Sequence, residues 1–352
     1  MKVAILGDTH FGARNDSPHF AAFFEKFYKE IFFPYLEQEN ILHVIQLGDV
    51  FDRRKFVNFQ TLNNAKKYFF EELNQKYTSW LLVGNHDVYY KNTNEVNSLE
   101  LLLGEYHNIN FVNAPTNIQL GETDALLVPW ICDDNEADVM RAVKNTTAQV
   151  MFGHLELSGF EMTKGQLIDH GMDPNLFKKF DLVVSGHYHH KSQGKNVVYT
   201  GTPYEMTWSD YNDVKGFHIF DTETRELQFI SNPFVLFHKL HYDDTDKDAS
   251  YLATFNVEEL EGCYVKLIVR HKNNHFWFDS LIDRLEKAGV VDLQVVEDHF
   301  NMDLETDDDI VNEAEDTLTI LKKFVDTTDV ATDKVKLTKL LRDLYEEALN
   351  LE

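Results

Sequence analysis

The first 240 residues predict a layered α/β sandwich, and three features of the sequence indicate it. Apolar runs of strand length alternate with helical patterns in the first part of this region. A run of further strands follows, which is typical of a layered sandwich rather than of a purely parallel sheet. In addition, five of the expected strands end beside a glycine and an Asp, Asn or His side chain.

The first part contains three apolar runs that are expected to form buried strands, at residues 1–6, 42–47 and 79–83. Apolar residues at helical spacing predict one helix that begins near Pro18 and two more over 60–77 and 98–106. Pro34 is expected to end or kink the first of these helices, because proline lacks the N–H that a helix interior needs.

The second part of the region is richer in strands and contains one expected helix at 133–144. The expected strands lie near Asn110, Gln119 and Leu126, at 149–152 and 181–185, and near Val198, Phe217 and Phe229.

The character of the chain changes near residue 240. The polar stretch at 243–248 is typical of a linker, and the patterns after it predict a small βαβ unit with strands at 263–269 and 290–296 and a helix at 274–288. An acidic stretch and two amphipathic helical patterns follow. We therefore expect three parts, at 1–240, 241–297 and 298–352.

The composition excludes several classes of protein. Cys132 and Cys263 are the two cysteines and form no CxxC pair, which argues against a disulfide framework and against a zinc–thiolate site. No apolar stretch approaches the roughly 20 residues of a membrane helix, and the N-terminal apolar run is too short for a signal peptide. We expect a soluble cytoplasmic protein.

The formal net charge of −26 is unusual for a protein that contacts nucleic acid. Residues 297–316 contain many acidic residues and no Lys or Arg, but the rest of the chain is acidic as well. A protein that bound DNA mainly by neutralising phosphates would be basic. Either the substrate is not a polyanion, or metal ions and a partner supply the positive charge.

Potential metal ligands follow five of the expected strands. In chain order the motifs are Asp8-x-His10, Gly48-Asp49, Gly84-Asn85-His86, Gly153-His154 and Gly186-His187-x-His189. Ligands collect outside the carboxyl ends of strands in open α/β sheets, so these side chains are expected to meet. Carboxylate and amide oxygens mixed with imidazole nitrogens suit manganese, iron or zinc rather than calcium. Two metal ions about 3.5–4 Å apart need a bridging carboxylate, for which we expect Asp49.

This order of motifs resembles the calcineurin-like metallophosphoesterase superfamily, over residues 8–189. Within it, the chain resembles the nuclease subunit of the SbcC–SbcD type double-strand-break repair complex, in the form carried by tailed bacteriophages. The resemblance extends to about residue 225 through 152–159 (FGHLELSG), 199–203 (YTGTP), 215–217 (KGF) and 220–224 (FDTET).

The resemblance implies a four-layer α-β-β-α sandwich, a small α+β capping domain at 241–297 that shapes DNA access, and a C-terminal helical pair. It also implies a DNA exonuclease and single-strand endonuclease with two divalent ions, Mn²⁺ first and Mg²⁺ as the alternative, in the cytoplasm of the host cell. One ion would be held by Asp8, His10, Asp49 and His189. The other would be held by Asp49, Asn85, His154 and His187.

His86 is not expected to bind metal, and the resemblance implies that it donates a proton to the leaving oxygen. We expect the Asp52 side chain to orient the His86 ring and to raise its pKa, so that His86 stays protonated near pH 7. The alternative for Asp52 is a turn or capping residue after the strand.

Partners follow from the same resemblance. An SbcC-type coiled-coil ATPase would be gripped by the helices at 307–352, and the chain would form a homodimer through the helices at 60–77 and 98–106. Two amphipathic helices after an acidic tether need a further surface to bury their apolar stripes, and the alternative is that they dock on their own chain. Arg14, Arg53, Arg54 and Lys55 are candidates for DNA phosphate contacts, with a solvated loop as the alternative.

Two other functions remain open at this point. A phosphoprotein phosphatase or small-molecule phosphodiesterase of the same superfamily is the first, because Asp52-Arg53 resembles the GDxxDRG motif of the phosphatases. Arg54 replaces the final glycine of that motif, and Val83 stands where those enzymes have an arginine that holds a phosphomonoester, so the sequence favours a diester substrate. A metal-free scaffold is the second, but none of the expected ligands is missing.

Overall fold

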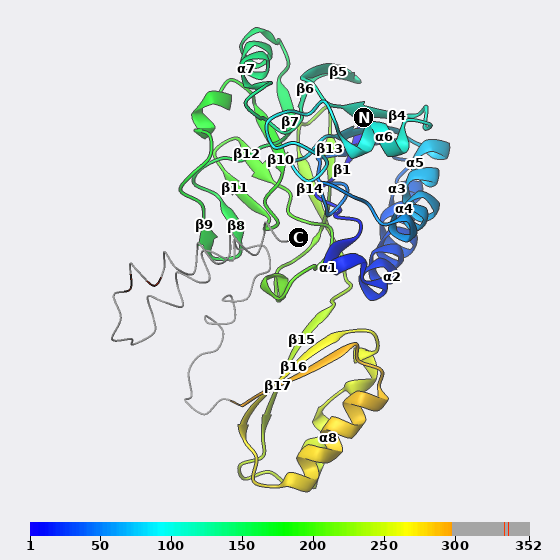
Figure 1. Ribbon diagram of the computed structural model, residues 1–352, viewed down its shortest axis with the longest axis vertical. Coiled ribbons are helices and arrows are strands. Elements are labelled where there is room, and N and C mark those ends of the chain that lie inside the picture. The colour runs from blue at the N-terminus through cyan, green and yellow to red at the C-terminus, as the bar shows by residue number, and fades with distance from the viewer. Residues whose placement is uncertain (298–333, 335–336, 338–352) are drawn as a thin grey trace. The chain divides into compact units, whose positions relative to one another are not determined.

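The computed structural model describes residues 1–297 and the isolated positions 334 and 337 (Figure 1). Two six-stranded mixed sheets form the larger part of the described chain, and helices cover their outer faces. This arrangement confirms the predicted sandwich. The expected C-terminal helical pair lies outside the described residues.

The first sheet has the strand order β14-β13-β1-β2-β3-β4. Its four parallel strands are β1 (Lys2–Leu6), β2 (His43–Gln46), β3 (Thr78–Leu82) and β4 (Ile109–Val112). Two antiparallel strands, β13 (Gly216–Asp221) and β14 (Leu227–Ser231), complete it beside β1. The three strands expected in the first part of the sequence therefore form the centre of this sheet.

The second sheet has the order β11-β12-β10-β7-β6-β5. Parallel pairing joins β6 (Thr123–Val128), β7 (Val150–His154), β10 (Leu182–Gly186) and β12 (Val197–Tyr199). The antiparallel edge strands are β5 (Thr116–Leu120) and β11 (Ser192–Gly194). A two-stranded hairpin of β8 (Glu161–Thr163) and β9 (Gln166–Leu167) lies outside both sheets.

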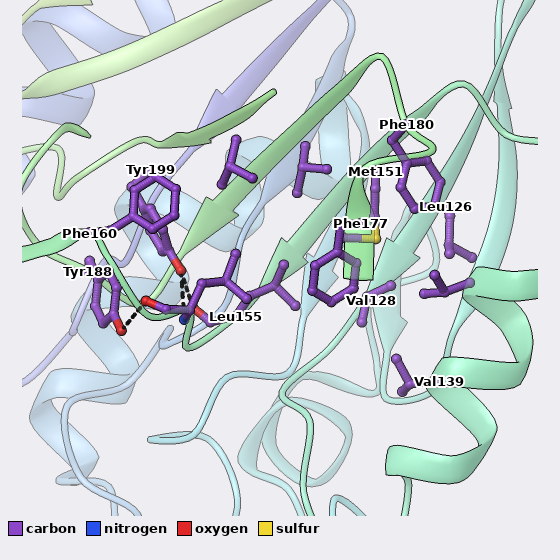
Figure 2. Packing of buried hydrophobic residues seen from close by; sticks show 14 of the residues in the cluster. Leu126, Val128, Val139, Met151, Leu155, Phe160, Phe177, Phe180, Tyr188 and Tyr199 are labelled. Atoms are coloured by element: carbon purple, nitrogen blue, oxygen red, sulfur yellow. Dashed lines mark hydrogen bonds between the residues drawn. The ribbon is translucent and has the colours of Figure 1, made fainter. Parts of the chain in front are cut away.

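Apolar side chains fill the space between the two sheets. Ile45 and Leu47 from the β2 region and Phe152 and Val184 from the second sheet belong to one fully buried cluster. A second cluster covers the outer face of the second sheet under α7 (Glu136–Asn145). There the hydroxyl of Tyr199 donates to the carbonyl of Leu155, so that this buried tyrosine is satisfied within the apolar layer (Figure 2).

The helical segment that begins at Pro18 does not end at Pro34, so the expected end was wrong, although the α-helix is interrupted by a π turn directly before this proline. The chain passes from α2 (Pro18–Phe27) through a π-helical turn (Tyr28–Phe32) into α3 (Phe33–Gln38), and Pro34 lies in the first turn of α3. The absence of an N–H at Pro34 is tolerated because the hydrogen-bond register changes at the π turn directly before this residue.

The segment expected at 60–77 is also interrupted by a π turn. It comprises α4 (Phe59–Ala65), the π turn (Lys66–Phe70) and α5 (Glu71–Lys76). The rings of Tyr28 and Phe69, one from each π turn, lie 4.6 Å apart in the aromatic layer over the first sheet. The remaining elements of this part are α1 (Ala13–Asp16), a single turn in which Arg14 and Asn15 have left-handed backbone angles, and the helix α6 (Ser98–Leu103).

The expected βαβ unit is present and has a third strand that the sequence did not reveal. Strands β15 (Phe237–Asp243), β16 (Tyr264–His271) and β17 (Asp292–Glu297) form a parallel sheet, and α8 (His275–Lys287) connects the last two. Tyr242 of β15 is fully buried in the apolar cluster of this unit. Among the described residues, no helix is both long and apolar enough to cross a bilayer.

Glu205 is a buried carboxylate where the chain enters this unit. It is 3% exposed, and its Oε2 accepts hydrogen bonds from the backbone N–H groups of Leu236 (2.6 Å) and Phe237 (3.0 Å). Burial raises the pKa of Glu205 to about 7. The folded protein therefore keeps a proton on Glu205 at pH values where the unfolded chain has released it.

Glu205→Gln is expected to remove a pH dependence of stability. Because the folded-state pKa is raised, this carboxyl group lowers the stability of the fold as pH rises from its usual pKa toward 7. A glutamine oxygen still accepts both N–H groups. We expect the variant to match the parent near pH 5 and to exceed it by about 1–3 kcal/mol near pH 8 in urea unfolding. Parallel pH profiles for the two proteins would contradict this.

Candidate metal centre

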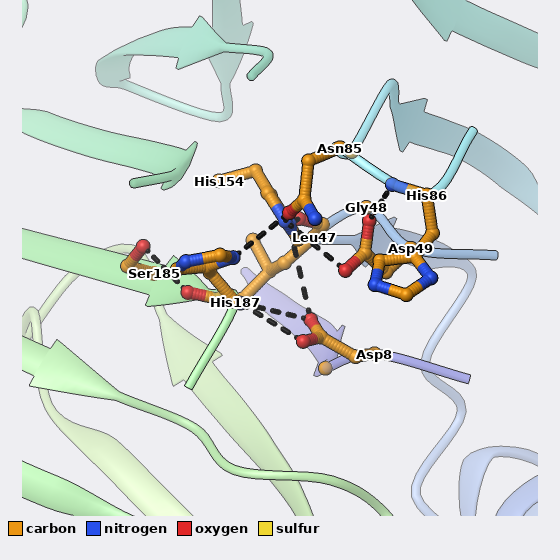
Figure 3. Close-up of polar contacts among 12 residues, drawn as sticks. Asp8, Leu47, Gly48, Asp49, Asn85, His86, His154, Ser185 and His187 are labelled. Atoms are coloured by element: carbon orange, nitrogen blue, oxygen red, sulfur yellow. Dashed lines mark hydrogen bonds and ion pairs between the residues drawn. The ribbon is translucent and has the colours of Figure 1, made fainter. Parts of the chain in front are cut away.

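The carboxyl ends of five parallel strands, β1, β2 and β3 of one sheet and β7 and β10 of the other, carry side chains that converge on one site (Figure 3). The structure brings all seven predicted metal ligands together there. They are Asp8, His10, Asp49, Asn85, His154, His187 and His189. Five of them are less than 9% exposed, and the two histidines of the loop after β10 are half-buried.

The ligands form two groups. Asp8, His10 and His189 make one, and Asp49, His154 and His187 make the other; within each group the potential ligand atoms lie within 4.8 Å of one another. Two adjacent three-residue groups of this kind are what a two-metal site requires.

Asp49 lies between the two groups. Its Oδ1 accepts a hydrogen bond of 2.7 Å from the backbone N–H of His86, and its Oδ2 lies 3.4 Å from Nε2 of His154 and 3.9 Å from Nε2 of His10. Asp49 has a φ of 52°, and a Cβ at position 84 would approach its backbone nitrogen to 2.2 Å. The glycine at 84 is therefore needed for Asp49 to occupy this place.

Asn85 and His154 complete the second group. The Oδ1 of Asn85 lies 2.9 Å from Nε2 of His154 and 2.8 Å from Nδ1 of His187. Nδ1 of His154 lies 2.8 Å from the carbonyl of Leu47 and donates to it, which leaves Nε2 with a free lone pair. A second hydrogen bond that fixes the tautomer in this way is typical of metal-binding histidines.

In the first group, two imidazole nitrogens face each other. Nε2 of His10 and Nε2 of His189 are 3.2 Å apart, and Oδ2 of Asp8 lies 3.9 Å from His189. Both oxygens of Asp8 accept from the backbone N–H of His187 at 3.0 Å. Two facing lone pairs beside a carboxylate fit a cation between them.

Comparison with known proteins agrees with this geometry. Residues 1–191 match the family described as calcineurin-like phosphoesterase. The chain belongs to the calcineurin-like phosphoesterase family. The fold of this family and the two groups of ligands imply divalent metal ions.

Three named proteins are relatives of this calcineurin-like phosphoesterase. Exonuclease subunit 1 of Enterobacteria phage T4 is 32% identical over 99% of both chains. The SbcD subunit of the nuclease SbcCD of Staphylococcus epidermidis is 26% identical over 39% of this chain and 36% of its own. A putative phosphoesterase, 078R, of Invertebrate iridescent virus 3 is 26% identical over 57% of each chain.

Asp52 does not orient His86 through its side chain, so that part of the prediction was wrong. Its carboxylate lies 3.4 Å from Nδ1 of His10, an ion-pair distance without hydrogen-bond geometry. It is the backbone carbonyl of Asp52 that contacts His86, 2.6 Å from Nδ1. Burial lowers the pKa of His86, whereas the Asp49 carboxylate and the Asp52 carbonyl raise it, so the expected rise from the Asp52 side chain is not the dominant effect. With Nδ1 bound to the carbonyl, Nε2 of His86 is the nitrogen left to exchange a proton.

Buried charges shift the pKa values of the ionisable side chains in this centre of the phosphoesterase. Burial, together with the carboxylate of Asp49, raises the pKa of Asp8 to about 7. Burial lowers the pKa of His187 to about 3, so this imidazole is neutral and its lone pair is available to a metal. Two divalent cations would relieve the repulsion between the two carboxylates.

Chelation of the metals is therefore expected to destabilise the folded phosphoesterase. An ion that binds only the folded state stabilises it by roughly 2.7 kcal/mol per site at a hundredfold excess over the dissociation constant. We expect the melting temperature to fall in EDTA and to rise again with added Mn²⁺. His154→Ala should reduce the rise, whereas a full rise in that variant would show that the ions bind elsewhere.

Three residues that support the site were not identified from the sequence. Asp87 accepts from the backbone N–H groups of Gly84, Val50 and Phe51 and so fixes the loops after β2 and β3. Its place in the motif Gly84-Asn85-His86-Asp87 was the available signal. The side chain of Gln46 bonds to both backbone groups of Gly48, and a glutamine inside an apolar strand was a signal as well.

Trp130 is the third of these residues. It stands in the loop after β6, and its ring lies 5.2 Å from the ring of His187. No spacing or motif in the sequence connects it to the metal ligands.

The four basic residues suggested for DNA contacts differ in their surroundings. Nε of Arg14 donates to the carbonyl of Met206, and Arg53 bonds to Asn15 and forms an ion pair with Asp16 at 3.5 Å. Arg54 is half-buried and Lys55 is exposed. The first two side chains therefore already have partners within the chain.

Proposed function

We propose that this chain is a two-metal DNA nuclease that hydrolyses phosphodiesters, and that it is the nuclease subunit of a phage recombination and double-strand-break repair complex. The observation that carries the proposal is the two groups of buried and half-buried potential ligands, with Asp49 between them. The full-length relative of phage T4 is named an exonuclease subunit, and the bacterial relative is named a nuclease subunit.

The residues of the centre have separate tasks in this reaction. Bound divalent ions, for which we propose Mn²⁺, would activate water and offset the charge that develops on the phosphate oxygens. Asp49 would bridge the ions, Asp8, His10 and His189 would hold one, and Asn85, His154 and His187 would hold the other. Nε2 of His86 would deliver a proton to the leaving oxygen. The Asp52 carboxylate would form an ion pair with Nδ1 of His10.

A diester fits the site better than a phosphomonoester. Val83, where the phosphatases of this family carry an arginine, is fully buried; its N–H donates to the carbonyl of Val112, and its own carbonyl accepts from Trp130. A guanidinium that could pair with a doubly charged phosphate is therefore not supplied from this position. A phosphoprotein phosphatase or small-molecule phosphodiesterase remains the second candidate, because the metal groups alone serve either reaction.

The test compares substrates at one Mn²⁺ concentration. We expect cleavage of single-stranded DNA and of the ends of double-stranded DNA, and much slower hydrolysis of a phosphomonoester such as p-nitrophenyl phosphate. Fast monoester hydrolysis with no DNA cleavage would assign the chain to the second candidate.

The proposals on partners concern one segment that lies mostly outside the described part of the chain, 307–352, and two parts that the structure describes. We propose that 307–352 bind an SbcC-type ATPase, that 241–297 shape DNA access, and that the nuclease forms a homodimer through α4, α5 and α6. A strongly acidic subunit that needs a partner to hold DNA is consistent with the net charge of −26. A chain that lacks 307–352 should keep its nuclease activity on short single strands and lose association with the ATPase; unchanged association would exclude this segment.

A further inference from the structure

Lys215 is buried directly behind the loop that follows β10. The side chain stands just before β13 and is 4% exposed. Its ammonium group contacts Oδ1 of Asp210 at 2.6 Å, Oδ2 of Asp213 at 2.8 Å and the carbonyl oxygen of His189 at 2.9 Å. These three acceptors match the three N–H donors of a lysine.

The same network reaches the residue after His189. Oδ1 of Asp213 lies 2.9 Å from Nδ1 of His190, while Oδ2 of the same carboxylate receives Lys215. Two consecutive residues of the loop therefore bond to this network, His189 through its carbonyl and His190 through its ring. On the opposite side, the backbone N–H of His187 is held by Asp8.

His189 needs this support more than His154, the histidine at the end of β7. The side chain of His154 is fully buried and its ring is fixed by the carbonyl of Leu47. The side chain of His189 is 26% exposed, and it comes from an irregular loop beyond the end of its strand. Packing alone therefore restrains the His189 ring less, and its backbone is fixed through its carbonyl, which accepts from Lys215 and from the N–H of Thr202 (3.2 Å).

We propose that Lys215 is a positioning residue for the metal ion of the Asp8, His10 and His189 group, and that it acts by fixing the backbone of His189 through its bonds to that carbonyl and to Asp213. The inference rests on the proposed two-metal centre. It predicts that loss of Lys215 weakens one of the two ions more than the other, because His154 and Asn85 of the other group are held by contacts outside this network and the backbone of His187 is held by Asp8.

A matched control is available in Lys179. Its ammonium also donates to three oxygens, the carbonyls of Val143 (2.9 Å), Lys144 (3.3 Å) and Thr146 (2.7 Å), at the end of α7. Lys179→Met therefore removes a lysine with the same number of bonds but leaves the loop after β10 untouched.

The test is calorimetric titration of the metal-free full chain with Mn²⁺, together with electron paramagnetic resonance of the loaded protein. The parent and Lys179→Met should bind two ions and show the signal of a coupled pair. Lys215→Met should bind one ion normally and the other about 10–100-fold more weakly, the usual cost of losing a residue that orients a ligand, and should show an uncoupled ion at low loading.

Two ions of unchanged affinity in folded Lys215→Met would overturn the role of Lys215 alone. No binding by the parent would overturn the metal centre, and this inference with it. If Lys215→Met does not fold, Asp213→Asn decides. An asparagine keeps one acceptor oxygen but has no charge, so its bond to the Lys215 ammonium is weaker, and the same ion should weaken by a smaller factor. Unchanged binding of both ions by Asp213→Asn would then overturn the proposal.

Discussion

Asp49→Asn is expected to lower DNA cleavage by about a thousandfold or more, equivalent to roughly 4 kcal/mol in the activation free energy. The amide has one oxygen and no charge, whereas the Asp49 carboxylate places one oxygen against the His86 backbone and the other between the two groups of ligands. A neutral side chain there cannot neutralise two cations or hold them at the short distance that the reaction needs. The measurement is single-turnover cleavage of a labelled single strand with Mn²⁺.

The matched control for this variant is Asp181→Asn. Asp181 is exposed and precedes β10, so it lies at the opposite end of the strand from the ligands, where it pairs with Arg225. Its loss removes the same charge without touching the centre, and we expect unchanged cleavage. An Asp49→Asn variant that cleaves within tenfold of the parent would show that Asp49 does not bridge the ions.

His86→Ser is expected to keep both metal ions and to cleave about 10²–10⁴-fold more slowly, the range for loss of a positioned proton donor. Nδ1 of His86 is occupied by the carbonyl of Asp52, and the backbone of His86 holds Asp49, so the variant loses the proton but not the N–H that supports the bridge. The loss should be smaller on a substrate whose leaving group needs no proton, such as bis(p-nitrophenyl) phosphate.

A control histidine variant and the metal content of His86→Ser distinguish a proton donor from a metal ligand at position 86. His43 stands at the start of β2, at the end of the strand opposite the ligands, and His43→Ser should leave cleavage unchanged. If His86→Ser loses one of its ions, then His86 is a ligand. An equal loss of rate on both substrates would argue against proton donation.

The positions of the ligands were predictable because each is fixed by its own strand. A short apolar run that ends in a glycine indicates locally where the next polar side chain goes, as at Asp8, Asp49 and His154, whereas their assignment to the two metal ions came from the resemblance. The contacts of Asp52 depend instead on two loops from different strands. The bridge between Phe11 and Phe51, with the N–H of Asp52 donating to the carbonyl of Phe11, places Asp52 beside His10.

The parts of the fold that the sequence did not reveal have equally specific causes. The helix continues past Pro34 because a π turn changes its hydrogen-bond register, and no helix propensity signals such a turn. Strand β15 contains Lys239 and His241 between apolar residues and was not expected, because its burial comes from pairing with β16. Lys215 is far from the ligands in sequence and reaches His189 only through the tertiary fold.

The most direct measurement is the anomalous scattering of crystals grown with Mn²⁺. Two peaks about 3.5–4 Å apart are expected, both in contact with Asp49, one beside Asp8, His10 and His189 and the other beside Asn85, His154 and His187. A single peak that does not touch Asp49, or no peak among these seven side chains, would contradict the two-metal centre and the nuclease function built on it.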